Sequence, residues 1–317
     1  RAAPRVYAVT TGPLPRIVAV VVTFNRLPLL KKLVERLGQV DGLAEVLVVD
    51  NASTDGTGTW LAARPTTGEV PLSGRTLATN RGGAGGFHDG LAWAIDRDAD
   101  LVWLMDDDGL PDVDCLEHLL EGTDDLDFWG PLVVDEADPG RLVFPIRRPG
   151  STRVVHAVDD VRRAAKQDRI DGIVIPFNGV LVTKELVDRI GLPREEFFIW
   201  GDDHEYRLRA EEAGARVATV VTATVRHPSV GNLGTPMMFG LTTYNDSPSD
   251  LKHYCMARNN LVNLRDYRGP LHALAFVVKT VWFYCFTRPS LSRLRLSAGA
   301  MRAGIAGDFD GHWRFLS

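Results

Sequence analysis

The chain contains three consecutive aspartates, Asp106, Asp107 and Asp108, directly after the apolar segment 101–105. Neighbouring carboxylates repel one another unless a cation or hydrogen-bond donors compensate them. Mg²⁺ and Mn²⁺ take oxygen ligands, bridge two phosphates and stabilise a departing diphosphate. The triplet therefore indicates a site for a divalent metal and a diphosphate. A solvated acidic turn or a helix cap before Pro111 is the structural alternative.

A second carboxylate pair, Asp202 and Asp203, follows the aromatic segment 197–200 and precedes a predicted helix over 205–213. A hydroxyl group is a poor nucleophile at neutral pH, so a carboxylate within hydrogen-bond reach can act as its general base. The pair is a candidate for that base. The alternative is that both residues only cap the helix and interact favourably with its dipole.

His227 ends a predicted strand over 216–225 and precedes Pro228. An imidazole at a strand end can complete a metal shell, although an isolated histidine is more often structural. The glycine-rich segment 80–87 offers backbone amides that suit a diphosphate or a sugar, or it forms only a surface turn. It matches neither the GxGxxG pattern at the first strand nor the P-loop pattern, which disfavours NAD binding and ATPase chemistry.

The elements that position these residues alternate between strands and helices. Apolar runs predict strands over 17–23, 45–49, 75–79 and 101–105, and helical spacing predicts helices over 28–37, 59–63 and 89–98. This alternation predicts an α/β fold with a mostly parallel central sheet, which binds ligands outside the carboxyl ends of its strands. Thr23, Asp50, Asn80 and Asp106 all follow such ends.

The second half of the chain is less regular. We predict strands over 132–134, 141–144 and 173–176 and a helix over 184–190, and after about residue 250 the sequence becomes helical and more basic. The chain is therefore expected to hold a catalytic domain over 1–250 and a helical C-terminal region over 251–317.

Composition narrows the class of protein. With 317 residues and 45% hydrophobic content the chain can bury one large core, and 36 basic against 41 acidic residues provide no positive field for nucleic acid. Cys115, Cys255 and Cys285 show no spacing for a disulfide framework or a zinc site, which fits a reducing, cytoplasmic compartment.

Read together, several segments resemble family 2 glycosyltransferases: 22–26 (VTFNR), 48–56 (VVDNASTDG), 80–83 (NRGG), 106–108, 200–203 (WGDD) and His227. The resemblance implies a GT-A fold and an inverting, metal-dependent transfer from a nucleoside-diphosphate sugar. It implies that Asp108 and His227 hold Mn²⁺ or Mg²⁺ and that Asp203 is the base, with Asp202 as the alternative. Residues implied in binding the nucleotide sugar are Thr23, Asn25, Arg26, Asp50, Asn51, Asn80, Arg81, Gly82, Gly83, Asp106 and Asp107. We expect Gly179, Phe198 and Trp200, together with Phe197, to contact the acceptor.

A closer resemblance is to the galactofuranosyltransferases of actinobacterial cell-wall galactan synthesis, above all those that start the galactan polymer. Segments 80–87, 103–109, 142–148 and 177–179, the pair Arg258–Asn259 and the aromatic segment 282–284 carry it. It implies a UDP-galactofuranose donor and a polyprenyl-diphosphate-linked glycan acceptor. Rhamnosyltransferases that use dTDP-rhamnose share much of this pattern.

Two other classes of protein fit less well. A sugar nucleotidyltransferase would carry a basic glycine-rich signature near its first loop, where this chain has Thr23-Phe-Asn-Arg-Leu-Pro28. A catalytically silent sugar-binding module would lack a metal residue or a base, and candidates for both are present.

The apolar run 271–286 is followed by Arg288, Arg293, Arg295 and Arg302. The run falls short of the roughly 20 residues that span a bilayer, so we expect it to be buried or to lie at an interface. An apolar face flanked by arginines suits peripheral contact with the inner face of the cell membrane. The alternative is packing against the catalytic domain or a second subunit of a homo-oligomer.

Overall fold

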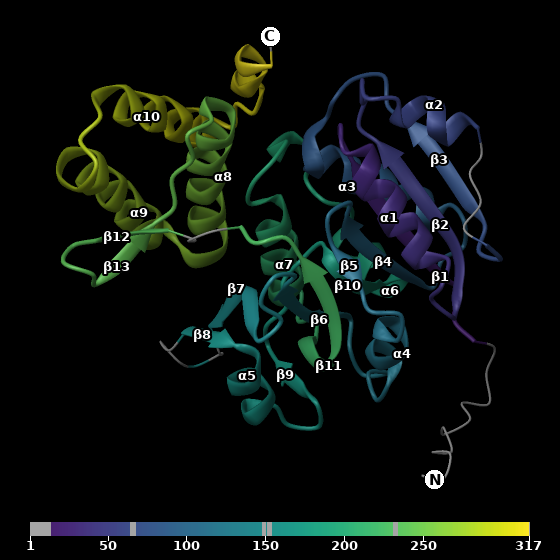
Figure 1. Cartoon of the computed structure of the whole chain (residues 1–317). Coiled ribbons are helices and arrows are strands. Elements are labelled where there is room, and N and C mark those ends of the chain that lie inside the picture. Colours follow the sequence, from purple (N-terminus) through teal and green to yellow (C-terminus); the bar gives the residue numbers. More distant parts are fainter. Residues whose placement is uncertain (1–13, 64–67, 148–149, 151–153, 231–233, 317) are drawn as a thin grey trace.

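A twisted mixed sheet with helices on both faces forms one part of the molecule, and a bundle of three long helices lies beside it (Figure 1). The structure is a computed structural model and describes residues 14–63, 68–147, 150, 154–230 and 234–316. Within that part of the chain, the large sheet runs in the order β3-β2-β1-β4-β10-β6-β11-β5, with β7, β8 and β9 attached at its side. The expected α/β fold with a helical C-terminal region is confirmed.

The strands of this sheet are β1 (Ile17–Thr23), β2 (Leu43–Asp50), β3 (Leu72–Thr76), β4 (Leu101–Asp106), β5 (Leu110–Pro111), β6 (Phe128–Asp135), β7 (Arg141–Arg147), β8 (Val154–Ala157), β9 (Arg169–Asp171), β10 (Asn178–Thr183) and β11 (Val217–His227). Strands β1 to β4 pair in parallel. Strand β10 is antiparallel to both β4 and β6, whereas β11 is parallel to β6. The carboxyl ends of β1, β2, β4 and β11 therefore lie at the same edge.

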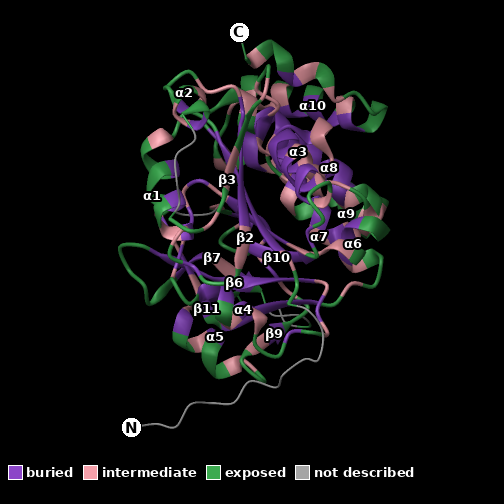
Figure 2. Ribbon diagram, turned by 90° about the vertical axis from the view of Figure 1, so that its right-hand side faces the viewer, coloured by how far each residue is buried: buried purple, intermediate pink, exposed green. Residues whose placement is uncertain are grey.

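The side chains of β1 point alternately to the two faces of the sheet, where they pack into two separate hydrophobic cores. Ile17, Ala19 and Val21 face one core, with α1 (Leu27–Leu37) and α4 (Cys115–Leu120) packed over it. Val18, Val20 and Val22 face the other, beneath α3 (Gly82–Ile95), α6 (Lys184–Ile190) and α7 (Asp202–Glu212). Because both faces are covered, every residue of β1 is buried, which explains its continuous apolar sequence. Figure 2 shows the central strands of the sheet coloured as buried.

The remaining elements are short or belong to the C-terminal region. Short helices are α2 (Thr57–Ala62), α5 (Val158–Ala164) and 3₁₀ turns at Glu195–Phe197 and Asp310–Phe315; a small hairpin pairs β12 (Thr235–Met237) with β13 (Thr242–Tyr244); and the long helices are α8 (Asp250–Arg268), α9 (Pro270–Trp282), continued by a π-helical turn at Phe283–Thr287, and α10 (Leu291–Ala306). The helix predicted over 184–190 has the observed bounds of α6.

Three sequence predictions need correction. The segment 173–176 is not a strand, and β10, which the sequence analysis missed, follows it at Asn178. Strand β3 begins and ends three residues earlier than predicted. Helix α3 begins at Gly82 rather than at residue 89, so most of the glycine-rich segment is helical.

Close packing explains why a glycine-rich segment forms a helix. A Cβ atom at Gly86 would lie 2.4 Å from a methyl group of Val22, and one at Gly90 would lie 2.4 Å from a methyl group of Val20. The glycines let α3 approach β1 more closely than a larger residue would allow. Tertiary contact therefore overrides their low helix propensity.

Helices α8 and α10 enclose a buried polar group, His253. Its Nε2 atom lies 2.8 Å from the Ser297 hydroxyl, which itself donates to the Arg293 carbonyl. The serine oxygen must therefore accept from the imidazole, and the Tyr284 hydroxyl lies 3.4 Å from Nδ1. Burial, with help from Arg293 and against Asp246 and Asp250, lowers the pKa of His253 to about 4.

This lowered pKa predicts acid sensitivity of the C-terminal region. Below pH 6.5, the ordinary pKa of histidine, His253 is protonated in the unfolded state but stays neutral in the folded state. The free energy of unfolding therefore falls as the pH drops from about 6.5 toward 4. Between pH 7 and pH 5 His253 should cost about 2 kcal/mol of unfolding free energy, at about 1.4 kcal/mol per pKa unit. Chemical denaturation at both pH values, for wild type and His253→Asn, checks this; equal pH dependence of the two proteins would contradict it.

Candidate active site

The loops after β1 and β2 are joined to each other by side-chain hydrogen bonds. The Asn25 side-chain oxygen accepts from the backbone amide of Thr54 at 2.7 Å, and Asp55 accepts from the amide of Leu27 at 2.8 Å, at the start of α1. Asp50, fully buried at the end of β2, accepts from Thr76 at 3.1 Å and from the amide of Ser53 at 3.0 Å. These contacts fix the shape of the edge where a nucleotide is expected.

The aspartate triplet lies at the end of β4 and is held by residues from the first loop. Asp107 is 4% exposed and accepts from the Thr23 hydroxyl at 2.7 Å and from Arg26 at 3.0 Å. Arg26 also donates to Asp108 at 2.6 Å. The guanidinium group of Arg26 thus supplies positive charge to two of the three carboxylates, and Thr23, Arg26, Asp107 and Asp108 form one network.

His227, at the end of β11, completes this network. Its Nε2 atom lies 3.3 Å from Oδ1 of Asp108, and its Nδ1 atom lies 2.7 Å from the carbonyl oxygen of Pro228. Burial alone would raise the pKa of Asp108, but His227 and Arg26 outweigh it and lower that pKa. Burial would likewise lower the pKa of His227, and Asp108 outweighs it in the opposite direction. The two residues predicted as metal ligands are therefore in contact.

The donor set fits a divalent cation. Because Nδ1 of His227 donates to the Pro228 carbonyl, Nε2 is the ring nitrogen that faces Asp108, and after loss of its proton it would bind an ion held between the two side chains. Among the residues that the structure describes, no group of three or more His, Cys, Asp or Glu has the arrangement of a metal site. One carboxylate and one imidazole suit an ion that completes its shell with phosphate oxygens and water, as Mg²⁺ commonly does.

The carboxylate pair begins α7, after Gly201. Burial, together with the charge of Asp203, raises the pKa of Asp202 to about 8. Burial and the charges of Asp108 and Asp107 raise the pKa of Asp106 well above its ordinary value, and the charge of Asp202 adds to this rise. Burial also raises the pKa of Asp203, but the amide of His204, at 2.6 Å, and the charge of Arg207 oppose the rise. Asp202 is therefore electrostatically coupled to the aspartate triplet, and Asp203 to Arg207.

The glycine-rich segment is bound to the loop after β2. The amide group of Asn51 donates to the Gly82 carbonyl at 2.5 Å and accepts from the Arg81 amide at 2.8 Å. The Asn80 side chain accepts from the Gly82 amide at 2.8 Å, and the Arg81 side chain pairs with Asp89 and Glu195. A Cβ atom at Gly83 would meet nothing within 4 Å, so this side of the first turn of α3 is open.

The residues expected at the acceptor differ in exposure. Phe197 and Phe198 are 0% and 3% exposed, because Phe197 stacks on Phe309 and Phe198 packs against His312. The expectation that these two rings stack on a sugar is therefore wrong: they belong to the core beneath the C-terminal segment. Trp200 is 36% exposed and remains available. Gly179 is buried in β10, where its carbonyl accepts from the Trp103 indole at 2.8 Å, so it does not line an open groove.

A cavity of about 970 Å³ lies along α7 beyond Asp203. Its lining includes five arginines, accompanied by three acidic residues and His204: Arg147, Arg169, Arg207, Arg216, Arg268, Asp125, Asp171 and Glu211. Desolvation inside the cavity and the charges of Arg207 and Arg268 lower the pKa of His204, although its side chain remains exposed to solvent. Composition alone did not indicate this cation-rich cavity, because its arginines are spread over 122 residues of sequence, from 147 to 268.

The search for known relatives agrees with this geometry. The model described as Glycosyl transferase family 2 matches residues 18–175. The chain is similar to Galactofuranosyltransferase GlfT1 of Mycolicibacterium smegmatis, with 31% identity over 287 residues that cover 87% of this chain and 92% of that protein.

Solved structures share the fold at low sequence identity. S. aureus TarS in complex with UDP gives a TM-score of 0.53 at 14% identity and covers 94% of this chain and 89% of that one. GalNAc-T7 with UDP, GalNAc and Mn²⁺ gives a TM-score of 0.55 at 13% identity, over 90% of this chain and 55% of that one. These neighbours confirm the expected GT-A-type fold.

Proposed function

Because the chain belongs to glycosyltransferase family 2, we propose that it transfers galactofuranose from UDP-galactofuranose to a lipid-linked glycan, with inversion and with the help of a divalent cation. One observation carries the proposal. The aspartate triplet contacts His227 through Asp108 and is coupled to the carboxylate pair through Asp106. The residues that we propose for the diphosphate and for the base thus lie at the same edge of the sheet.

In the proposed mechanism, Asp203 takes the proton of the acceptor hydroxyl while the hydroxyl oxygen attacks the anomeric carbon. The bond from that carbon to the diphosphate oxygen breaks in the same step, so the configuration inverts. Asp108 and His227 would hold Mn²⁺ or Mg²⁺, which neutralises charge on the leaving diphosphate when bound. Asp50 and Asp106 would contact the nucleoside, and Thr23 and Arg26 orient Asp107 and Asp108 through their hydrogen bonds.

The electrostatics of the pair favour Asp203 over Asp202 as the base. A base must be ionised before it can accept a proton. Burial and its neighbour raise the pKa of Asp202 to about 8, which holds it protonated at neutral pH, whereas Arg207 counteracts the rise at Asp203. Arg207 also lines the cation-rich cavity, so Asp203 lies on the side that we assign to the acceptor.

The base and the metal are tested in one transfer assay. Asp203→Asn should lower kcat by about 10²–10⁴-fold, the usual contribution of a general base, while the affinity for UDP stays within about 2-fold of wild type. EDTA should abolish transfer, and added Mn²⁺ or Mg²⁺ should restore it. Both effects are measured in one assay, in which the release of UDP reports transfer to a synthetic lipid-diphosphate glycan.

Matched variants and donors make this test decisive. Asp202→Asn is the control for the neighbouring carboxylate, and a smaller loss than in Asp203→Asn is expected. Turnover by Asp203→Asn at the wild-type rate would remove Asp203 as the base, and full activity in EDTA would remove the metal. Faster transfer from dTDP-rhamnose than from UDP-galactofuranose would reassign the donor, and cleavage that releases UMP rather than UDP would indicate nucleotidyl transfer.

We also propose that the cation-rich cavity receives the diphosphate of the acceptor. Arginine forks suit phosphate oxygens, and Arg147 has no ion pair to a described residue. Arg207 and Arg268 both form ion pairs with Glu211. Desolvation and the charges of these two arginines lower the pKa of His204. The cavity thus carries an excess of positive charge, and one of its arginines, Arg207, interacts with Asp203, which supports a phosphate-bearing acceptor.

Arg147→Gln should therefore raise the acceptor KM by about 10–150-fold, as expected for the loss of one charge-assisted interaction of about 1.5–3 kcal/mol, without a change in the donor KM. Arg163→Gln is the matched control, because Arg163 pairs with Asp160 on α5, outside the cavity. Steady-state kinetics with the diphosphate acceptor and with a phosphate-free glycan show whether Arg147 binds the diphosphate or the sugars of the acceptor. An unchanged KM for the diphosphate acceptor would refute the assignment.

The third element of the proposal is a peripheral position on the inner face of the membrane. The helical stretch Pro270–Thr287 has the length and composition of a membrane span, but only 22% of it is buried. Buried Ala273 and Thr280 define its inner face, and Leu271 and Leu274 are 78% and 58% exposed on the other. This run, which was expected to be buried or to lie at an interface, is therefore buried on one face only.

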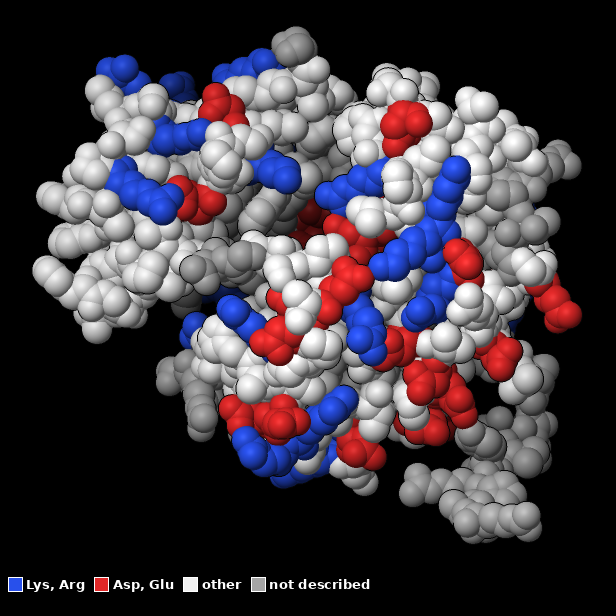
Figure 3. Space-filling model, in the orientation of Figure 1, with Lys and Arg blue, Asp and Glu red and all other residues white. Residues whose placement is uncertain are grey.

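A hairpin extends the exposed apolar surface of α9. Phe239 and Leu241, in the turn between β12 and β13, are 101% and 86% exposed, and Met238 and Thr242 meet Leu271 along a shallow groove. Residues 250–317 hold ten basic and four acidic residues, a net charge of +6 in a chain of net charge -5. In Figure 3 the outer end of this region is mostly white, with basic side chains above it. An apolar face beside positive charge suits an anionic bilayer.

The protein should float with vesicles that contain phosphatidylglycerol and should not float with neutral phosphatidylcholine vesicles. The double variant Phe239→Ser with Leu241→Ser should lose most of this binding, because it removes the two most exposed apolar side chains of the hairpin. Val113→Ser is the matched control, since Val113 is 48% exposed elsewhere on the molecule. Equal flotation of the double variant would refute the assignment, and dimerisation that the double variant abolishes would assign the surface to a second copy instead.

A further inference from the structure

The loop that leads into the carboxylate pair has an unusual backbone. We call residues 196–201 the base loop, because Asp202 and Asp203 follow it directly. Phe198, Trp200 and Gly201 have φ angles of 65°, 66° and 85°. Large side chains rarely adopt positive φ, at a cost on the order of 1–3 kcal/mol each, and they keep it only where the surroundings over-determine it. Something must therefore hold the base loop in this shape.

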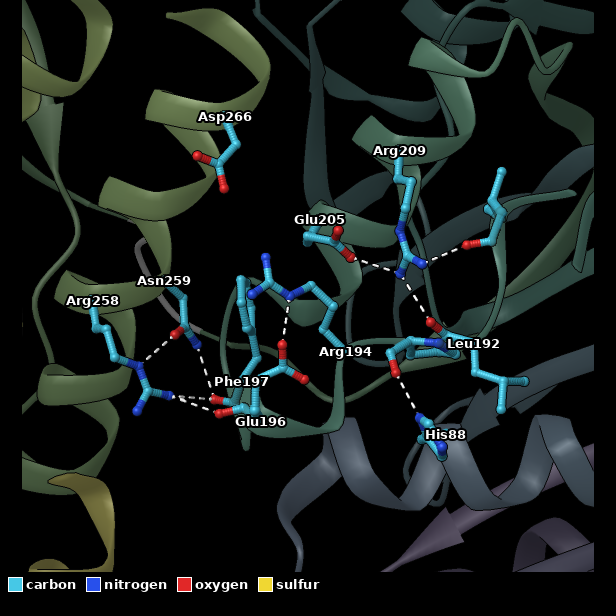
Figure 4. Close-up of polar contacts among 12 residues, drawn as sticks. His88, Leu192, Arg194, Glu196, Phe197, Glu205, Arg209, Arg258, Asn259 and Asp266 are labelled. Atoms are coloured by element: carbon cyan, nitrogen blue, oxygen red, sulfur yellow. Dashed lines mark hydrogen bonds and ion pairs between the residues drawn. The ribbon is translucent and has the colours of Figure 1, made fainter. Parts of the chain in front are cut away.

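Side chains of α8 bind the carbonyl oxygens of the base loop one after another, and Figure 4 shows those of Arg258 and Asn259 at Glu196 and Phe197. Asn259 donates from its amide nitrogen to the carbonyls of Phe197, Ile199 and Trp200, at 3.0, 3.2 and 2.7 Å. Arg258 donates to the carbonyls of Glu196 and Phe197, at 3.2 and 3.0 Å. One turn further along the helix, Asn263 donates to the Gly201 carbonyl at 2.8 Å.

Arg258 orients Asn259 as well as the loop. Its Nε atom donates to the side-chain oxygen of Asn259 at 2.9 Å, so the amide nitrogen of Asn259 must point at the carbonyls. Both side chains are fully buried, and no carboxylate of the described residues forms an ion pair with Arg258. Burial accordingly lowers the pKa of Arg258. A buried guanidinium without an ion pair is expensive, so stability alone is a poor reason for its presence.

The opposite side of the base loop rests on the donor side of the site. The amide of Ala84, in the first turn of α3, donates to the Phe198 carbonyl at 3.1 Å. A Cβ atom at Gly82 would lie 1.9 Å from that carbonyl oxygen, so only glycine allows this approach. The base loop is therefore held between α3 and α8, with its carbonyls divided between them.

We propose that Asn259, oriented by Arg258, is a positioning residue that sets the location of Asp203 relative to the donor and the acceptor. The inference rests on the proposed function, in which Asp203 is the base. Because the three carbonyls that Asn259 binds immediately precede α7, a shift of the loop moves both carboxylates together. The C-terminal region thereby determines the geometry of a site to which it contributes no reacting group.

The test compares Asn259→Ala with a matched control on the same helix bundle. Displacement of a base by about 1 Å costs on the order of 10²-fold in rate, so kcat should fall by about 10–100-fold while UDP affinity stays within 2-fold. Ser297→Ala is the control, because it removes the hydrogen bond to His253 on α8 without touching the base loop. It should lower the melting temperature and leave kcat unchanged.

Several outcomes would overturn the inference. A folded Asn259→Ala enzyme with wild-type kcat does so, and so does a kcat loss in Ser297→Ala that matches its loss of stability. If Asn259→Ala does not fold, Asn263→Ala removes only the bond to Gly201 and should show a smaller loss of kcat with unchanged UDP affinity; wild-type kcat in that variant would also refute the idea. Full activity of Asp203→Asn in the same assay would instead refute the proposed base, whatever Asn259 does.

Discussion

The concentration of carboxylates at one edge of the sheet is the constraint on which the rest of the structure depends. Asp106, Asp107, Asp108, Asp202 and Asp203 follow or face the end of β4, and burial raises the pKa of four of them while Asp108 alone is lowered overall. Such a group destabilises the fold unless positive charge and donors surround it. Positive charge and hydrogen-bond donors come from four separate places in the chain, at Thr23, Arg26, Arg207 and His227.

The two parts of the chain carry net charges of opposite sign. Residues 250–317 carry a net charge of +6, so residues 1–249, with 26 basic and 37 acidic residues, carry -11. The negative part holds the site for a metal and a diphosphate, whereas the positive part provides the apolar, basic surface that we assign to the bilayer. Figure 3 shows acidic side chains recessed in the hollow between the two parts. A phosphate-bearing acceptor would meet the base where these two parts meet.

The sequence predicted those features that local pattern controls. Strand β1 and helix α6 were predicted with their observed bounds, because continuous apolar residues and regular helical spacing report burial directly. The family resemblance named Asp108 and His227 as joint metal ligands, and the structure brings the two side chains into contact. The helical start at Gly82 was not predicted, because only the approach of α3 to Val20 and Val22 makes glycine favourable there.

What the sequence could not predict is the set of contacts that join distant segments. Phe197 and Phe198 looked like sugar-binding aromatics because the residues that cover them, Phe309 and His312, come more than 100 positions later. The pair Arg258–Asn259 contributed to a family resemblance without an evident role, since its partners are backbone carbonyls of residues 196–200 and carry no sequence signal. Backbone acceptors are chemically alike at every position. A side chain that recognises a particular loop through them is therefore visible only when the fold brings helix and loop together.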